Sequence, residues 1–311
     1  MSTRAPRVLH TGQAIADIVL RIPALPSAGG DVLASATDIT AGGGFNVMAA
    51  AARDGAPVTY LGAIGEGPFA NIVTSALKTE GIEVPNPPVT GTDTGFSVAM
   101  VDDSTERTFV TSPGAETYVQ LEHLTGTAVS AHDIVYVTGY SLLHEHNRAS
   151  LLKWIPTLPA ATTIIFDPSP LVHEIADEAW TLLQQRATIW TLNVREAALA
   201  ATRFNAPAED PRTLLDTLAG HLHGRVILRD GNAGAYLSEH TPPLIPGMRV
   251  RAVDTNGAGD AHTGVLAAAL TRGDNLHDAV RRANIAAAFA VTRTGPATAP
   301  HRADIDRALH A

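Results

Sequence analysis

The stretch "VDTNGAGDAHTGVLAAAL", residues 253–270, carries most of the information about the fold and the site. Two aspartates flank three small residues, and an alanine-rich apolar run of helical length follows them. The first backbone N–H groups of a helix have no partner within the helix, and the helix dipole adds about half a positive charge there. We therefore predict that Gly257, Ala258 and Gly259 form an anion-binding turn, because their small side chains allow an anion to approach closely.

Asp260 is the unexpected residue in this turn. Its carboxylate repels a phosphate, so its position makes chemical sense if it removes a proton from a hydroxyl group that attacks the phosphate. General-base catalysis of this kind contributes about 10²–10⁴-fold in rate. The anion turn would then stabilise the charge on the transferring phosphoryl group. The alternative is an aspartate that only complements the helix dipole, and the local pattern leaves both interpretations open.

The composition narrows the classes of protein to consider. A chain of 311 residues suffices for one large α/β domain with a full core. Without cysteine it has neither disulfides nor a thiolate zinc site, which fits a cytoplasmic location. The net charge of −9, from 22 basic and 31 acidic residues, argues against nucleic acid or a membrane surface as partner. We expect no signal peptide and no transmembrane helix.

Apolar segments of strand length alternate with helical patterns along most of the chain. This alternation predicts an α/β fold with a mainly parallel sheet covered by helices on both faces. The predicted strands cover residues 7–12, 58–65, 133–139, 162–170, 188–193, 224–231, 234–239 and 250–256. The predicted helices cover residues 45–55, 68–81, 148–158, 178–187, 194–201, 211–223, 259–273 and 276–295.

Two further segments, around residues 14–40 and 94–111, do not fit this alternation. The second has the pattern of a hairpin whose turn is "DDSTE", residues 102–106. We predict that these strands form a small separate sheet lying over the main one, inserted into a single domain that spans residues 1–311.

Four motifs together resemble one known family. "DTNGAGDAHTG", residues 254–264, resembles the C-terminal signature of the ribokinase-like (phosphofructokinase-B) sugar and nucleoside kinases. "AGGGFNVMAAAARDGAPVTYLGAIGEGPFA", residues 41–70, is similar to their glycine-rich sugar-binding segment. "NVRE", residues 193–196, resembles their N-x-x-E motif, and "ILRDGNAGAYL", residues 227–237, their nucleotide-binding strand and turn. The motifs occur in the family's order, so the resemblance covers nearly the whole chain and implies a three-layer α/β/α domain with a β-sheet lid.

The resemblance assigns the acceptor side of the site. It implies that Asp260 is the catalytic base and that residues 257–259 form the anion hole, the same roles that the residues themselves suggest. It also implies that Asp17, Gly42, Gly43 and Asn46 bind the sugar. A carboxylate such as Asp17 accepts hydrogen bonds from two neighbouring hydroxyl groups. Gly43 stands where ribokinase itself often has a lysine, so ribose is in doubt as the substrate. The alternatives are a solvated turn residue at Asp17 and a loop without a ligand at the glycines.

The resemblance also assigns residues to ATP and Mg²⁺. It implies that Asn193 and Glu196 organise the phosphates and Mg²⁺, the glutamate largely through water. Asn193 and Glu196 also have the spacing of a helix capping box, and both roles are compatible. Arg229 and Gly231 occupy positions that approach the nucleotide. Many members have threonine where this chain has Arg229, which either binds a phosphate bidentately or forms a surface ion pair.

A monovalent cation, K⁺, is a further expectation from the resemblance. The matching positions are Asp254, Asn256 and the carbonyl groups between Ala290 and Gly295. The alternative is an ordinary loop that binds no cation and is stabilised by Asp254 alone.

The sequence thus predicts an ATP-dependent kinase that phosphorylates a hydroxyl group, expected to be primary, of a small sugar. The first alternative is an adenosine-kinase-like nucleoside kinase, in which Phe45 and Phe96 would stack on a base. A sugar or nucleotide sensor without catalysis is a second alternative, although the base and the anion hole are both intact. An NAD-type oxidoreductase is disfavoured, because this chain lacks the glycine loop that such enzymes have after the first strand. The resemblance also implies a homodimer formed through the lid sheet.

Overall fold

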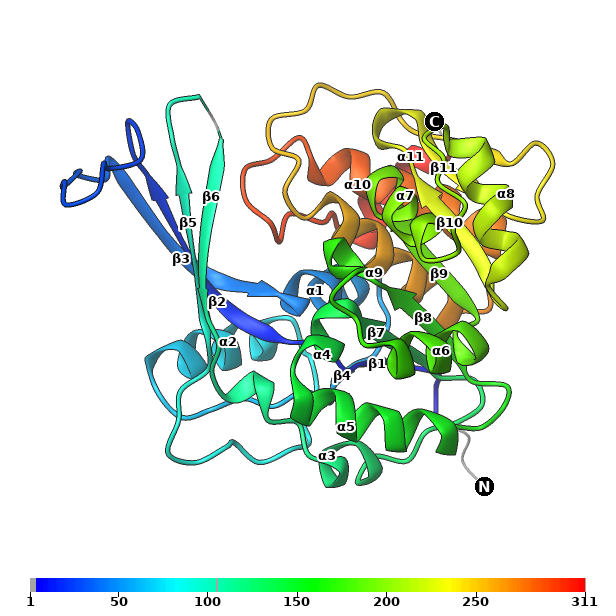
Figure 1. Ribbon diagram of the computed structural model, residues 1–311, viewed down its shortest axis with the longest axis horizontal. Helices are drawn as coiled ribbons and strands as arrows, with labels where there is room; N and C mark the ends of the chain where they lie inside the picture. Colours follow the sequence, from blue (N-terminus) through cyan, green and yellow to red (C-terminus); the bar gives the residue numbers. More distant parts are fainter. Residues whose placement is uncertain (1–3, 105, 311) are drawn as a thin grey trace.

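The computed structural model describes residues 4–104 and 106–310. They form one large sheet with helices on both faces and a small second sheet at one side (Figure 1). The strands of the large sheet are β1 (Val8–His10), β4 (Val58–Tyr60), β7 (Ile134–Thr138), β8 (Thr163–Asp167), β9 (Ile189–Asn193), β10 (Arg225–Arg229), β11 (Gly234–Leu237) and β12 (Leu244–Pro246). Their order is β12-β11-β10-β9-β8-β7-β1-β4. The strands from β4 to β10 are parallel, and β11 and β12 are antiparallel. The predicted α/β class is confirmed.

Helices cover both faces of this sheet because side chains alternate between the faces along each strand. Val8 of β1 belongs to one buried apolar cluster and its neighbour Leu9 to the other. The helices are α1 (Gly44–Arg53), α2 (Pro68–Thr79), α3 (Leu121–Thr125), α4 (Gly139–Leu143), α5 (Glu145–Trp154), α6 (Asp177–Arg186), α7 (Val194–Thr202), α8 (Pro211–His221), α9 (Ala258–Thr271), α10 (Leu276–Ala290) and α11 (Arg302–Leu309). Side chains of α1, α2, α9 and α10 pack in the first cluster, and those of α5 to α8 in the second.

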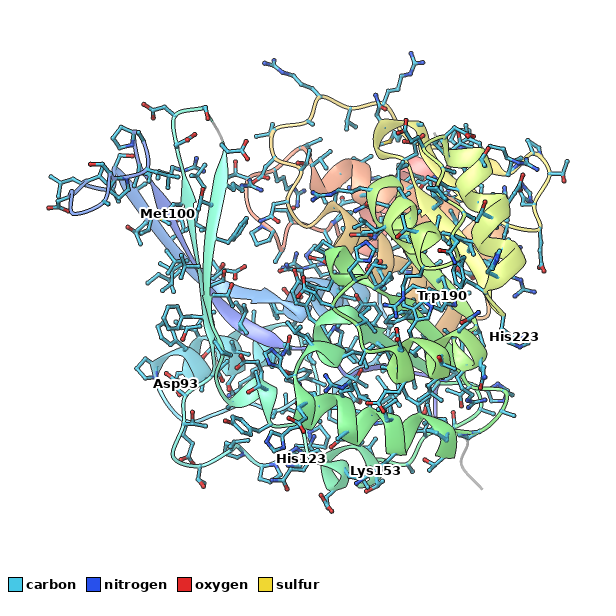
Figure 2. All side chains as sticks on the ribbon, viewed as in Figure 1. Asp93, Met100, His123, Lys153, Trp190 and His223 are labelled. Carbon is cyan, nitrogen blue, oxygen red and sulfur yellow. The ribbon has the colours of Figure 1, made fainter. Side chains whose placement is uncertain are left out.

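Aromatic side chains fill the second cluster. Trp190 of β9 is fully buried and meets Phe166 edge-on, with ring centroids 4.8 Å apart. Trp180 of α6 also packs against Trp190, with ring centroids 5.1 Å apart. Figure 2 shows Trp190 inside the main body of the molecule. This core fixes the strands whose ends carry the site.

The small sheet, called the lid sheet below, consists of β3, β2, β5 and β6 in that order. Its strands are β2 (Ala14–Arg21), β3 (Ala36–Gly43), β5 (Phe96–Val101) and β6 (Arg107–Ser112). It extends away from the main body, with Met100 on its outlying part (Figures 1 and 2). The separate sheet and the β5–β6 hairpin are as predicted, although Thr105 of the predicted turn lies outside the described residues. The strand expected to end at residue 40 continues to Gly43, so β3 carries the glycine segment directly into α1.

Two predictions of secondary structure are wrong, and further elements, α11 among them, were not predicted. Residues 250–256 form no strand, and Val253 is 64% exposed. The alternating valines have no sheet partner there, because the preceding segment has already paired as β12. The last predicted helix ends at Ala290 rather than at residue 295, and α11 was not predicted. The anion turn is therefore reached through a loop and not directly from a strand.

The strand order places the polar ends of several strands at one edge. The chain passes from β1 to β4 on one side and later to β7 on the other, so the order reverses beside β1. Ligands of open α/β sheets bind beyond the carboxyl ends of the strands near such a reversal. Asp167, Asn193 and Arg229 are the last residues of β8, β9 and β10.

No helix in the described ranges combines the length and apolar character needed to cross a membrane.

Candidate functional site

A cavity of about 1080 Å³ opens at the carboxyl ends of the parallel strands. Strand ends, the start of α9 and the loop before it line the cavity. The residues at its wall include Tyr140, Asp167, Asn193, Glu196, Arg229, Gly231, Asn256, Gly257, Ala258, Gly259, Asp260, His262 and Asn284. The predicted nucleotide residues and the predicted anion turn therefore share one cavity.

The turn before α9 has the geometry of an anion site. Gly257 is the N-cap residue and has a φ of 74°, which is left-handed backbone. A Cβ atom at this position would lie 1.9 Å from the carbonyl oxygen of Pro296, so no larger residue fits. The N–H groups of Gly257, Gly259 and Asp260 have no hydrogen-bond partner among the described residues. They are thus available to an anion at the positive end of a long helix.

Asp260 lies in the first turn of α9, beside these free N–H groups. The Nδ2 atom of Asn46, on α1, donates a hydrogen bond of 3.0 Å to its Oδ2 atom. Burial raises the pKa of Asp260 to about 6, and the charge of Asp167 adds to this while the Asn46 hydrogen bond opposes it. A carboxylate with a pKa close to neutrality is well suited to accept a proton from a hydroxyl group.

Asp17 is the second carboxylate near this point. Burial, together with the negative charge of Asp260, raises its pKa to about 6. A Cβ atom at Gly42 would lie 1.9 Å from the Oδ2 atom of Asp17, so the glycine leaves room for this side chain. Gly43 has a φ of 60° and ends β3 immediately before α1. The glycine segment thus links β3, which pairs with the strand of Asp17, to α1, which carries Asn46.

Asn193 and Glu196 form the capping box that their spacing predicts. The N–H group of Glu196 donates to the Oδ1 atom of Asn193 at 2.9 Å, and that of Asn193 donates to the Oε2 atom of Glu196 at 2.8 Å. Burial and the charge of Asp167 raise the pKa of Glu196, while Arg229 lowers it. Both side chains line the cavity, so capping α7 and facing a ligand are compatible.

Arg229 connects two parts of the cavity. Its Nη2 atom donates to Asp167 at 3.2 Å and to Glu196 at 3.3 Å. Burial lowers the pKa of Arg229, but the two carboxylates outweigh this and raise it. A Cβ atom at Gly259 would lie 2.5 Å from the Nη1 atom of Arg229, so the guanidinium group extends over the anion turn. Its buried Nε atom has no partner among the described residues. Gly231 follows at the cavity wall in a short 3₁₀ turn.

Asp254 lies outside this cavity wall, and its carboxylate is already hydrogen-bonded. Its Oδ1 atom accepts bonds from Arg107 of β6 at 2.6 Å and from the N–H group of Asn256 at 2.8 Å. Its Oδ2 atom accepts a bond from the N–H group of Gly295 at 3.0 Å. Burial raises the pKa of Asp254, but these hydrogen bonds, first that of Arg107, hold it below its ordinary value.

The structure brings the predicted residues together as three groups around the start of α9. In the first, Asn46 hydrogen-bonds Asp260, whose charge acts on Asp17, and Gly42 packs against Asp17. The second group, Asn193, Glu196, Arg229 and Gly231, lines the cavity. The predicted cation residues form a third group, in which Thr298 donates to the carbonyl oxygens of Ala290 at 3.0 Å and Gly295 at 3.3 Å. No group of three or more acidic or histidine side chains suited to a metal occurs in the described part of the chain.

The site residues that the sequence analysis missed include two charged ones, Asp167 and Arg107. Asp167 ends a strand of the predicted parallel sheet, and that position alone was a usable signal because ligands bind at the carboxyl ends of such strands. Arg107 follows the hairpin turn of the lid sheet, and its partner Asp254 is 147 positions away. Nothing in the local sequence indicates that contact.

Comparisons with known proteins bear on the family and the fold. Residues 6–302 match the family described as pfkB family carbohydrate kinase. The uncharacterized sugar kinase YegV of Escherichia coli K12 is 30% identical over 305 residues, which cover 97% of this chain and 94% of that protein. Among solved structures, a ribokinase of Arabidopsis thaliana complexed with ribose and ATP has a TM-score of 0.80 at 22% identity, covering 99% of this chain and all of the other.

An adenosine kinase of Sinorhizobium meliloti is similar to the same degree, with a TM-score of 0.81 at 21% identity and coverage of 98% of this chain. At these identities the two solved structures establish the fold alone. The predicted ribokinase-like fold is thus confirmed.

Proposed function

The chain belongs to the pfkB family of carbohydrate kinases, and we propose that it transfers the γ-phosphoryl group of ATP to a primary hydroxyl group of a small sugar. The observation that carries the proposal is the position of Asp260. Its carboxylate lies at the N-terminus of α9, beside free N–H groups, and Asn46 holds it by a hydrogen bond. A base next to an anion site is the arrangement that hydroxyl-to-phosphate transfer requires.

The residues of the chain divide the work of the reaction. Asp17 accepts hydrogen bonds from sugar hydroxyl groups, and Asn46 keeps the Asp260 carboxylate directed at the attacking hydroxyl. Asp260 takes the proton of that hydroxyl as its oxygen forms a bond to the γ-phosphorus and the bond to the ADP oxygen breaks. The N–H groups at Gly257 and Gly259 and the guanidinium group of Arg229 stabilise the charge on the transferring group.

The donor set also fits a magnesium ion bound with the nucleotide. Mg²⁺ in phosphoryl-transfer enzymes is held by one or two carboxylates together with waters and substrate phosphates. Asp167 and Glu196 supply such carboxylates at the cavity wall, and the Arg229 guanidinium group now compensates their charge. When bound, the ion neutralises phosphate charge and orients the phosphates.

The aromatic residues favour a sugar over a nucleoside as acceptor. Phe45 was one of two candidates for stacking on a base, but it is a residue of α1, is only 6% exposed and belongs to the apolar core. The other candidate, Phe96, packs on Phe69 with ring centroids 4.6 Å apart. Phe45 therefore has no free face of the kind that base stacking needs, and Phe69 already occupies one side of the Phe96 ring.

The direct test is ADP release with ATP and Mg²⁺ across pentoses, hexoses, ketoses and ribonucleosides. We expect turnover on at least one sugar and none of comparable efficiency on ribonucleosides. Efficient turnover on ribonucleosides alone would replace the proposal by the nucleoside-kinase alternative. Protein that binds ATP but phosphorylates no member of the panel would contradict the proposal.

The pH dependence of turnover should report the state of Asp260. Burial raises the pKa of both Asp260 and Asp17 to about 6. The base must be ionised, so we expect kcat/KM to rise as the pH increases through about 6 and to level off above it. Steady-state rates with sugar as the varied substrate, between about pH 4.5 and pH 8.5, measure this. A rate that increases toward acid pH would contradict the role of the base.

Replacing Asp17 with asparagine should act on the sugar and not on the nucleotide. We expect KM for the sugar to rise by about tenfold or more, because one charged acceptor of hydroxyl hydrogen bonds is lost. KM for ATP should change little. The acid limb of the pH profile should also shift to lower pH, since a negative charge close to Asp260 is removed. Equal effects on both KM values would show that Asp17 only supports the fold.

The lid sheet is the proposed dimer interface. Ile39 on β3 and Val110 on β6 lie in one cross-strand row on the same face of the lid sheet, and both are more than half exposed. We propose that a second copy covers this face. Light scattering of the protein with Ile39 and Val110 both changed to serine should then give a monomer where the parent gives a dimer.

A further inference from the structure

An ion pair joins the lid sheet to the loop before the anion turn. Arg107, the first residue of β6, donates from Nη2 to the Oδ1 atom of Asp254 at 2.6 Å. The Asp254 side chain is 8% exposed and that of Arg107 is 29% exposed, so the pair is largely shielded from water. Figure 1 shows β6 on the side of the lid sheet that faces the loops before α9 and after α10.

The same carboxylate holds the backbone on which the anion turn rests. Asp254 accepts the N–H groups of Asn256 and Gly295, and so ties the two loops together. The N–H groups of Val253 and Asp254 both donate to the carbonyl oxygen of Val291, at 2.7 and 3.1 Å. Gly257 packs directly against Pro296 of the second loop. The position of the turn therefore depends on this junction, and Arg107 supplies its positive charge.

The junction does not fit the monovalent cation that the sequence led us to expect. Three donors already occupy the two oxygens of Asp254. The carbonyl oxygen of Ala290 accepts bonds from Thr298 and from the N–H group of Arg293 at 3.2 Å. A cation would have to displace a fixed guanidinium charge from a shielded carboxylate, and that exchange is unfavourable.

We propose that Arg107 is a positioning residue whose guanidinium group takes the place of the monovalent cation at Asp254. It holds the anion turn in its binding geometry when the lid sheet lies against the main body, and the protein needs no K⁺. The coupling also makes closure of the lid and completion of the anion turn one event. The turnover readout below rests on the proposed kinase function, and the binding readout does not.

The test compares cation dependence between the parent protein and three variants. Calorimetry of Mg²⁺-ADP binding and rates of sugar phosphorylation are measured in KCl and in tetramethylammonium chloride, both at about 0.1 M so that screening is equal. Arg107→Ala removes the charge and Arg107→Lys keeps it. Arg21→Ala is the matched control, because Arg21 lies on the lid sheet and forms no ion pair with any described residue.

For the parent and for the Arg21→Ala control, we expect the ADP affinity and kcat each to differ by less than about twofold between the two salts. Arg107→Ala should lose about tenfold or more in ADP affinity and in kcat in tetramethylammonium chloride, and K⁺ should recover most of that loss. Arg107→Lys should stay insensitive to K⁺.

Three results would overturn the proposal. A parent protein that K⁺ activates about tenfold would show that the cation still binds. An unchanged Arg107→Ala variant would show that the ion pair positions nothing. A loss in Arg107→Ala that is the same in both salts would show that the charge is not what matters. If no sugar is phosphorylated, the kinase proposal fails, and the ADP-binding data still decide the role of Arg107.

Discussion

Asp260→Asn is expected to lower kcat by about a thousandfold while the protein stays folded and still binds ATP. The amide has nearly the shape of the carboxylate but cannot take up the proton of the attacking hydroxyl. Burial raises the pKa of Asp260 from 3.8 to about 6, so the folded protein binds this proton more tightly than the unfolded chain. The resulting stabilisation is lost as the pH rises from about 4 to about 6. At pH 8 the neutral amide should therefore leave Tm unchanged or slightly raised.

A matched control separates catalysis from a helix-dipole effect. Asp278 is the third residue of α10, as Asp260 is of α9, and it lies in the first helical turn. Asp278→Asn should cost a little stability, since it weakens bonds to Asn275 and His277, and should leave kcat unchanged. Steady-state rates of turnover give kcat for both variants, and thermal unfolding gives their stability. Asp260→Asn with a rate near that of the parent would remove the assigned base.

The second large effect is expected from Gly257→Ala. The new Cβ would lie 1.9 Å from the carbonyl oxygen of Pro296, and an alanine at a φ of 74° is strained in addition. The turn must move, and its N–H groups then no longer point at the phosphoryl group. Loss of one such donor lowers kcat by about 10²–10³-fold in enzymes that stabilise an oxyanion, and we expect a loss of that size.

Gly273→Ala is the control for backbone strain alone. Gly273 has a φ of 85°, but no atom lies within 4 Å of the position that its Cβ would take. Both substitutions should lower the free energy of unfolding by about 1 kcal/mol through the left-handed backbone, and only Gly257→Ala should lower it further. Only Gly257→Ala should lower kcat. Comparable activity losses in both variants would mean that general instability, and not the anion turn, explains the effect.

The alternation of apolar strands and helices was sufficient to predict the layered fold, because each buried strand carries its own apolar signature. The glycines before Asp260 indicated a tight turn at the start of a helix, and Gly257 does have left-handed backbone there. The segment 250–256 misled because alternating valines indicate a strand only when a partner strand is free, and β12 already pairs with β11. Pairing of strands is a property of the whole chain.

The relation of the acidic residues to their partners could not be predicted for the same reason. Asp167 contacts Arg229 across 62 positions and Arg107 contacts Asp254 across 147. Asn46 reaches Asp260 across 214 positions, and the family resemblance assigns both residues a role without indicating that they touch. Local patterns place each residue at the end of a strand or helix. Which ends meet follows only from the order of the strands in the sheet.

Analysis of the reaction products tests the central claim most directly. The protein is incubated with ATP labelled in the γ-phosphoryl group, Mg²⁺ and the sugar of highest turnover, and the products are separated and identified by mass spectrometry and phosphorus NMR. The account predicts labelled sugar phosphate, esterified at a primary hydroxyl group, in equal amount to ADP. ADP formed together with free labelled phosphate, or label found only on a nucleoside, would contradict it.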